Sequence, residues 1–147
     1  MSIINAFTHG DHQKNLGHFA SIVKMALVDG VITEGEEKFL KRKARSLNMT
    51  DEEVKEILKN PDKYPINPPV GYDESITRLY RLTQMLYADD TPSKEEVNFL
   101  KRIIVGLGFP VKNIDKVASE AVHLVMNNND LDDFAEAIKT VNSDLYE

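Results

Sequence analysis

Apolar residues recur along this chain at the three- and four-residue spacing of a helix face, and no segment shows the period of two that is typical of a strand. The first apolar stripe is formed by Leu16, Phe19, Val23 and Ala26. It predicts a helix over about residues 14–28.

Residues suited to helix ends follow this stripe. Thr33 and Glu36 have the spacing of a capping box, in which a hydroxyl and a carboxylate each accept a backbone N–H at a helix start. Thr50 and Glu53 repeat the motif, and Asn48 suits the left-handed residue that ends a helix. We therefore expect one helix after Thr33 and a shorter one after Thr50.

A proline-rich stretch then interrupts the helical pattern over residues 60–72. Proline lacks a backbone N–H and disfavours helical angles in the residue before it. We interpret this stretch as an irregular connection between two helical halves.

The second half opens a new series of helices. Asp73 is the expected N-cap of the first, Ser93 with Glu96 forms another capping box, and Asn113 is the expected N-cap of a third helix.

A last helix is expected over about residues 131–144, opened by Asp130 or Asp133. The pattern as a whole predicts an all-α, single-domain bundle of about seven helices. Its parts are a first repeat over about 14–59, the connection, a second repeat over about 73–126, and the last helix.

The two halves match at a constant offset of 60 residues without a gap. Eight identities support the match: Met25, Asp29, Glu36, Phe39, Leu40, Lys41, Arg42 and Leu47 fall on Met85, Asp89, Glu96, Phe99, Leu100, Lys101, Arg102 and Leu107. We expect two helical repeats related by a pseudo-twofold axis.

Each repeat carries an acidic residue and a second carboxylate seven positions later, Asp29 with Glu36 and Asp89 with Glu96. If the repeats pack face to face, these four carboxylates converge, and such hard oxygen ligands suit Ca²⁺, Mg²⁺ or Mn²⁺. Like charges held close repel unless a cation or a proton neutralises them. The alternative is that Glu36 and Glu96 only cap helices, where carboxylates are stabilising without a metal.

Three histidines near the start, His9, His12 and His18, could bind zinc. Two of them precede the expected helix, so we interpret them as incidental surface residues. His123 lies beside an apolar helix face and is expected to be partly buried.

Other side chains fit either a partner surface or ordinary structure. Four tyrosines either line a groove beside the connection or pack in the core: Tyr64, Tyr72, Tyr80 and Tyr87. Basic runs follow the acidic turns and form a solvated face that suits a protein partner recognised by charge: Lys38, Lys41, Arg42, Lys43, Arg45, Lys101 and Arg102.

Composition narrows the function classes. The 147 residues include no cysteine, which excludes disulfides, thiolate nucleophiles and sulfur-ligated metals. A net charge of −6 argues against nucleic acid as a partner, because phosphate binding needs a basic surface. No apolar run reaches the length of a membrane span, and the start does not have the pattern of a signal peptide, so we expect a cytoplasmic protein with no membrane insertion.

The segment from Asp29 to Glu37, with its apolar helix before and Phe-Leu-rich helix after, resembles the TerB-like family associated with tellurite resistance. A related domain occurs in a membrane-anchored J-domain co-chaperone. The resemblance covers about residues 15–125 and implies an all-helical fold, metal binding through acidic residues, and a role in stress-response complexes. By position it implies Asp29, Glu36, Asp89 and Glu96 as metal ligands, although Asp90 departs from the family's Asp-Gly pattern.

No nucleophile–base arrangement and no glycine-rich phosphate loop stands out, so we do not expect an enzyme. The hypothesis is a non-catalytic binding module that holds a divalent cation between two acidic turns and docks a protein partner. The alternative is a structural or adaptor domain without metal, whose carboxylates only cap helices.

Overall fold

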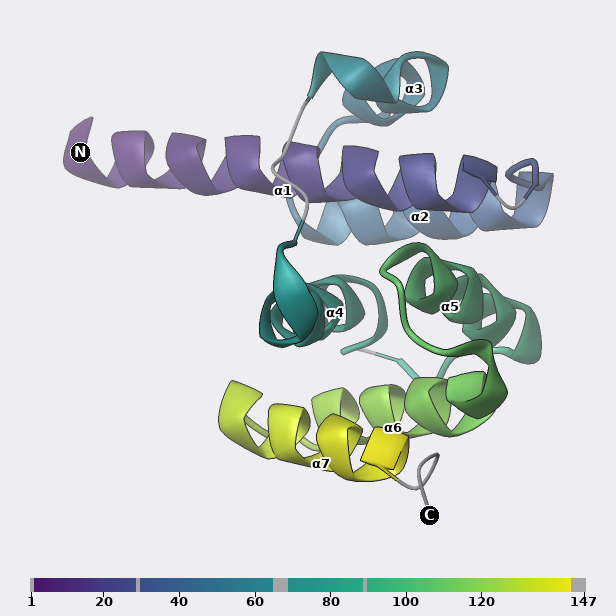
Figure 1. Cartoon of the computed structure of the whole chain (residues 1–147). Helices are drawn as coiled ribbons and strands as arrows, with labels where there is room; N and C mark the ends of the chain where they lie inside the picture. Colours follow the sequence, from purple (N-terminus) through teal and green to yellow (C-terminus); the bar gives the residue numbers. More distant parts are fainter. Residues whose placement is uncertain (1, 29, 65–68, 89, 144–147) are drawn as a thin grey trace. The chain divides into compact units, whose positions relative to one another are not determined.

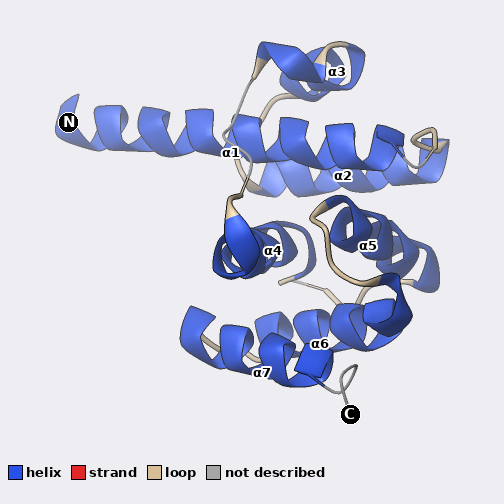
Figure 2. Cartoon of the chain, in the orientation of Figure 1, coloured by secondary structure: helices blue, strands red, loops and turns tan. Residues whose placement is uncertain are grey.

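The computed structural model describes residues 2–28, 30–64, 69–88 and 90–143, with side chains from His12 onward. Over these ranges the chain forms seven α-helices, two short 3-10 helices and no strand (Figure 1, Figure 2). The prediction of an all-α bundle of about seven helices is confirmed. The chain divides into two compact units, residues 1–67 and 68–147, and the division falls inside the proline-rich connection.

The first unit contains α1 (Ser2–Val28), α2 (Glu34–Ser46), α3 (Asp51–Lys59) and the 3-10 helix η1 (Pro61–Lys63). Helix α3 packs against both α1 and α2, and η1 packs against α1 and α3. The buried apolar side chains of this unit come mainly from the stripes that the sequence predicts: Leu16, Phe19, Ile22, Val23, Phe39, Leu40, Ala44, Val54 and Ile57.

Helix α1 begins at Ser2, so the prediction that it starts near residue 14 was wrong. Residues 2–13 contain no proline, and their only glycine, Gly10, costs a long helix about 1 kcal/mol. The apolar stripe marks where a helix packs, whereas the backbone hydrogen bonds continue as long as no residue breaks them. His9 and His12 therefore lie within α1 and do not precede it.

The second unit contains α4 (Gly71–Tyr87), α5 (Lys94–Gly106), the 3-10 helix η2 (Val111–Asn113), α6 (Ile114–Met126) and α7 (Leu131–Ser143). Helix α6 packs against α4, α5 and α7, and α7 also packs against α4 (Figure 1). Among the described helices of both units, none is long and apolar enough to cross a membrane.

The predicted helix ends of the first unit are present. Thr33 Oγ1 accepts the Glu36 N–H at 3.1 Å, and Glu36 Oε1 accepts the Thr33 N–H at 2.9 Å. Thr50 and Glu53 form the same pair of bonds at 3.1 and 2.8 Å. Asn48 adopts a left-handed φ of 62° after α2, as predicted. These ends depend on neighbouring residues only, which is why the sequence predicts them well.

Two N-cap predictions in the second unit were wrong. Helix α4 begins at Gly71 with Val70 as N-cap, and Glu74 Oε2 accepts the Val70 N–H at 2.7 Å, so Asp73 lies in the first turn. Asn113 does precede α6, but its side chain does not cap it and instead donates to the Val141 carbonyl of α7 at 2.8 Å. In both cases another contact satisfies the polar group that the cap would have used.

Candidate functional site

The first acidic turn leads into α2, where Glu36 is held by its own capping box. Its side chain is buried, at 7% exposed, and one carboxylate oxygen accepts the Thr33 N–H at 2.9 Å. That oxygen is committed to the start of the helix, as the capping alternative requires.

The second acidic turn leads into α5 in a similar way. Ser93 Oγ accepts the Glu96 N–H at 3.2 Å, which confirms Ser93 as N-cap. The hydroxyl of Tyr87, a residue only 1% exposed, donates to the Glu96 carbonyl at 2.8 Å and ties the end of α4 to the start of α5. Glu96 is half-buried, whereas Glu36 is buried.

The other two predicted ligands, Asp29 and Asp89, lie outside the described residues. Glu36 belongs to the first unit and Glu96 to the second, and each is positioned by contacts within its own unit. Among the described side chains, no group of three or more His, Asp or Glu could hold a metal ion. The four-carboxylate cation site therefore stays a prediction.

The sequence missed a role for one of the three early histidines. His12 Nε2 on α1 lies 2.8 Å from Glu53 Oε2 on α3, and both side chains are about three-quarters buried, at 22% and 26% exposed. Glu53 thus connects α1 to α3 with one oxygen and caps α3 with the other. Burial raises the pKa of Glu53, but the hydrogen bonds from the Thr50 N–H and from His12 outweigh it, so the pKa lies below its ordinary value.

The remaining histidines fit structural positions. His18 is half-buried in α1, and the side chain of His9 lies outside the described part of the structure. His123 is exposed, so the expectation that it is partly buried was wrong. It sits on the outer side of α6, next to Asn127, whose side chain donates to the His123 carbonyl at 2.7 Å.

The four tyrosines have separate roles. Tyr64 in the first unit donates to Glu56 Oε2 at 3.2 Å, and burial, followed by the hydrogen bond to Glu56, raises the pKa of its hydroxyl. Tyr80 donates to the Asn129 carbonyl at 3.0 Å. Tyr87 packs in the core, as one alternative predicts, whereas Tyr72 is 45% exposed.

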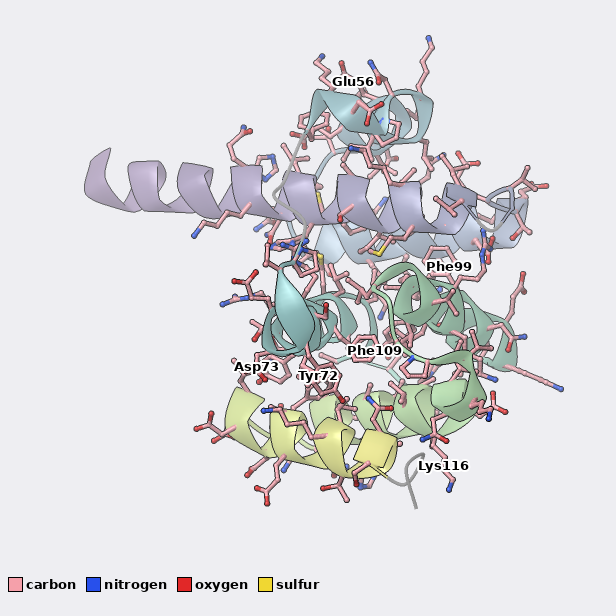
Figure 3. All side chains as sticks on the ribbon, viewed as in Figure 1. Glu56, Tyr72, Asp73, Phe99, Phe109 and Lys116 are labelled. Carbon is pink, nitrogen blue, oxygen red and sulfur yellow. The ribbon has the colours of Figure 1, made fainter. Side chains whose placement is uncertain are left out.

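The basic runs pack closely on their own helices. Arg42 lies over the Phe39 ring at 5.5 Å, and Arg102 lies over the Phe99 ring at 5.6 Å (Phe99 is labelled in Figure 3), both within the range of a cation–π contact. These pairs occupy matching positions in the two repeats of the sequence.

No family model matches the chain, and neither the curated proteins nor the solved structures contain a match.

Proposed function

We propose that this chain is a non-catalytic binding module that holds a divalent cation between two acidic turns and docks a protein partner. The observation that carries the proposal is the equivalence of α2 and α5. Each helix has 13 residues, each begins one residue after a hydroxyl N-cap, and the second starts 60 residues after the first. Glu36 and Glu96 take the same position in both helices.

The helix ends extend this equivalence. Asn48 and Gly108, again 60 residues apart, both have a positive φ, of 62° and 94°. The next residue donates back to the helix in each case, Met49 to the Ala44 carbonyl and Phe109 to the Ile104 carbonyl. We infer two copies of one helical unit related by a pseudo-twofold axis, with their acidic turns brought together by that symmetry.

The resemblance to the TerB-like family supports the same function and points to a cytoplasmic stress-response complex, of the kind associated with tellurite resistance. The cation would be Ca²⁺, Mg²⁺ or Mn²⁺, because carboxylate oxygens suit hard ions. Asp29 and Asp89 would supply the ligands that do not also cap helices.

Isothermal titration with CaCl₂, MgCl₂ and MnCl₂ tests the cation half directly. A cation present at 100 times its Kd stabilises the folded state by about 2.7 kcal/mol. For a chain of this size that corresponds to a rise in Tm of roughly 5–10 °C. Neither heat nor a rise in Tm with any of the three ions would reject cation binding.

A double variant, Asp29→Asn with Asp89→Asn, locates the site. Without metal it should melt above the wild type because it removes repulsion, and with metal it should melt below. Asp62→Asn with Asp115→Asn is the matched control, since it removes the same charge from side chains that are 80% and 82% exposed. If both double variants behave alike, the effect is one of net charge and the acidic turns hold no ion.

The second candidate is an adaptor domain without metal. Its specific support is the bond from the Thr33 N–H to Glu36 Oε1, which already occupies one of the proposed ligands. The titration decides between the two functions, because only the first predicts that a cation changes Tm.

A further inference from the structure

Three parts of the second unit meet at Tyr72, near the start of α4. Its ring meets the Phe109 ring edge-on, with the centroids 6.0 Å apart, and Figure 3 labels both side chains. Its hydroxyl accepts a hydrogen bond from Asn142 Nδ2 near the end of α7 at 2.6 Å. Asn113 of η2 joins the same region by donating to the Val141 carbonyl at 2.8 Å. The contacts hold α4, η2 and the end of α7 together.

Apolar side chains at this junction face solvent. Val70 is 76% exposed, Tyr72 45% and Val111 66%, whereas Phe109 beside them is buried at 5%. Val70 precedes Tyr72 by two residues, and Val111 follows Phe109 by two. Exposed apolar groups gathered at one place mark interaction sites more often than exposed residues scattered singly.

A buried polar atom lies at the same junction. Asn142 is 6% exposed, and its Oδ1 has no hydrogen-bond partner in the structure. Turning the amide by 180° would let the Tyr72 hydroxyl donate to the oxygen, but the NH₂ group would then lack an acceptor. A buried polar group without a partner is costly, and a donor arriving from outside the chain would remove that cost.

Charge indicates what kind of partner suits this surface. The second unit has eight Lys and Arg against fourteen Asp and Glu, whereas the first unit has ten of each. The whole net charge of −6 therefore belongs to the unit that carries the junction. A basic segment would be attracted to it, and an acidic one repelled.

We propose that this junction, formed by Val70, Tyr72, Phe109, Val111 and Asn142, docks an extended peptide segment of a protein partner, apolar at its centre and basic at its ends. The inference rests on the partner-docking half of the proposed function and is independent of the cation. The apolar centre covers the two exposed valines and the Tyr72 ring. A backbone N–H of the segment donates to Asn142 Oδ1, and the Lys or Arg ends face the acidic unit.

Fluorescence anisotropy with the full chain tests the proposal at 150 mM NaCl. The probe is a fluorescein-labelled peptide, Arg-Lys-Leu-Ile-Leu-Lys-Arg, and its control replaces the three central residues by serine. We expect the apolar probe to bind at least about tenfold more tightly, as burial of a few methylene groups allows. Equal affinity for the two peptides, or no binding up to about 1 mM, would overturn the proposal.

Matched variants locate the binding surface. Val70→Ser with Val111→Ser should weaken the apolar probe about tenfold. Val28→Ser with Val31→Ser is the control, because these valines are 82% and 78% exposed in the first unit. It should leave affinity within about twofold. A comparable loss in the control pair places the binding elsewhere and sinks the proposal.

Asn142→Leu tests the hydrogen bond separately. It removes the acceptor at similar volume and should weaken the probe about fivefold while leaving the melting temperature close to that of the wild type. Unchanged affinity would overturn the role of Asn142. If this variant fails to fold, the valine variants still decide the surface.

Two further measurements separate the possible outcomes. Deletion of residues 144–147 should not change affinity; a gain of more than about tenfold would make the chain's own C-terminal residues the occupant and overturn the partner assignment. Probe binding that persists in EDTA supports this inference even where the cation half fails. Calcium heat without probe binding would have the opposite meaning.

Discussion

Replacing Glu53 by alanine should destabilise the first unit at two points at once. The carboxylate of Glu53 accepts the Thr50 N–H with Oε1 and contacts His12 with Oε2, both at 2.8 Å. The alanine variant loses the capping box of α3 and the polar link from α3 to α1. Glu52→Ala is the matched control, because Glu52 lies in the same first turn but is exposed.

The magnitude follows from these two contacts. A hydrogen bond contributes about 0.5–1.5 kcal/mol net, and an ion pair at the surface contributes less than about 1 kcal/mol. Side chains that are 22% and 26% exposed fall between these cases, so the two contacts together should contribute about 1–2 kcal/mol. Glu52→Ala should change stability by less than about 0.5 kcal/mol.

Urea denaturation followed by circular dichroism measures both variants. The pKa of Glu53 is lowered in the folded state, so its stabilisation is complete above the ordinary value of 4.5 and is lost as pH falls through the folded value. The difference between wild type and Glu53→Ala should therefore be largest near neutral pH and shrink below about pH 4. A difference equal to that of the Glu52 control, or one that does not change with pH, would refute the reasoning.

Two other substitutions test local features of the second unit. Gly108→Ala should cost about 1–2 kcal/mol in urea denaturation, because φ is 94° there and a Cβ would meet nothing within 4 Å, which leaves backbone strain as the cause. Asn48→Gly, at the matching position of the first unit, should instead stabilise by up to about 1 kcal/mol, and the reverse order would contradict this account. Tyr87→Phe should lower the free energy of unfolding by about 1 kcal/mol through loss of the 2.8 Å bond to the Glu96 carbonyl. A Tyr87→Phe variant as stable as the wild type would mean that this bond contributes nothing.

The helix pattern and most helix ends could be predicted because they depend on residues close in sequence. Thr33 with Glu36, and Thr50 with Glu53, are three residues apart, and Asn48 needs only its own backbone angle. Where prediction failed, a distant or competing contact was the reason. Asn113 bonds to Val141, 28 residues away, and Asp73 pairs with Lys139 at 2.9 Å.

The candidate site divides in the same way. The sequence alone identifies the acidic turns and places Glu36 and Glu96 at equivalent helix starts, because that information is a spacing. It gives no sign of the junction at Tyr72, whose bond to Asn142 joins residues 70 positions apart. The nearest sequence signals were the tyrosines beside the proline-rich connection.

By itself, the sequence determined that this protein is helical, where most of its helices end, and which side chains face inward, because periodicity and capping act over a few residues. Only the tertiary structure decided which polar groups meet across the chain: His12 with Glu53, Tyr87 with the Glu96 carbonyl, and Tyr72 with Asn142. Such pairs depend on how helices pack against one another, and a helix face permits many partners at similar cost until packing selects one.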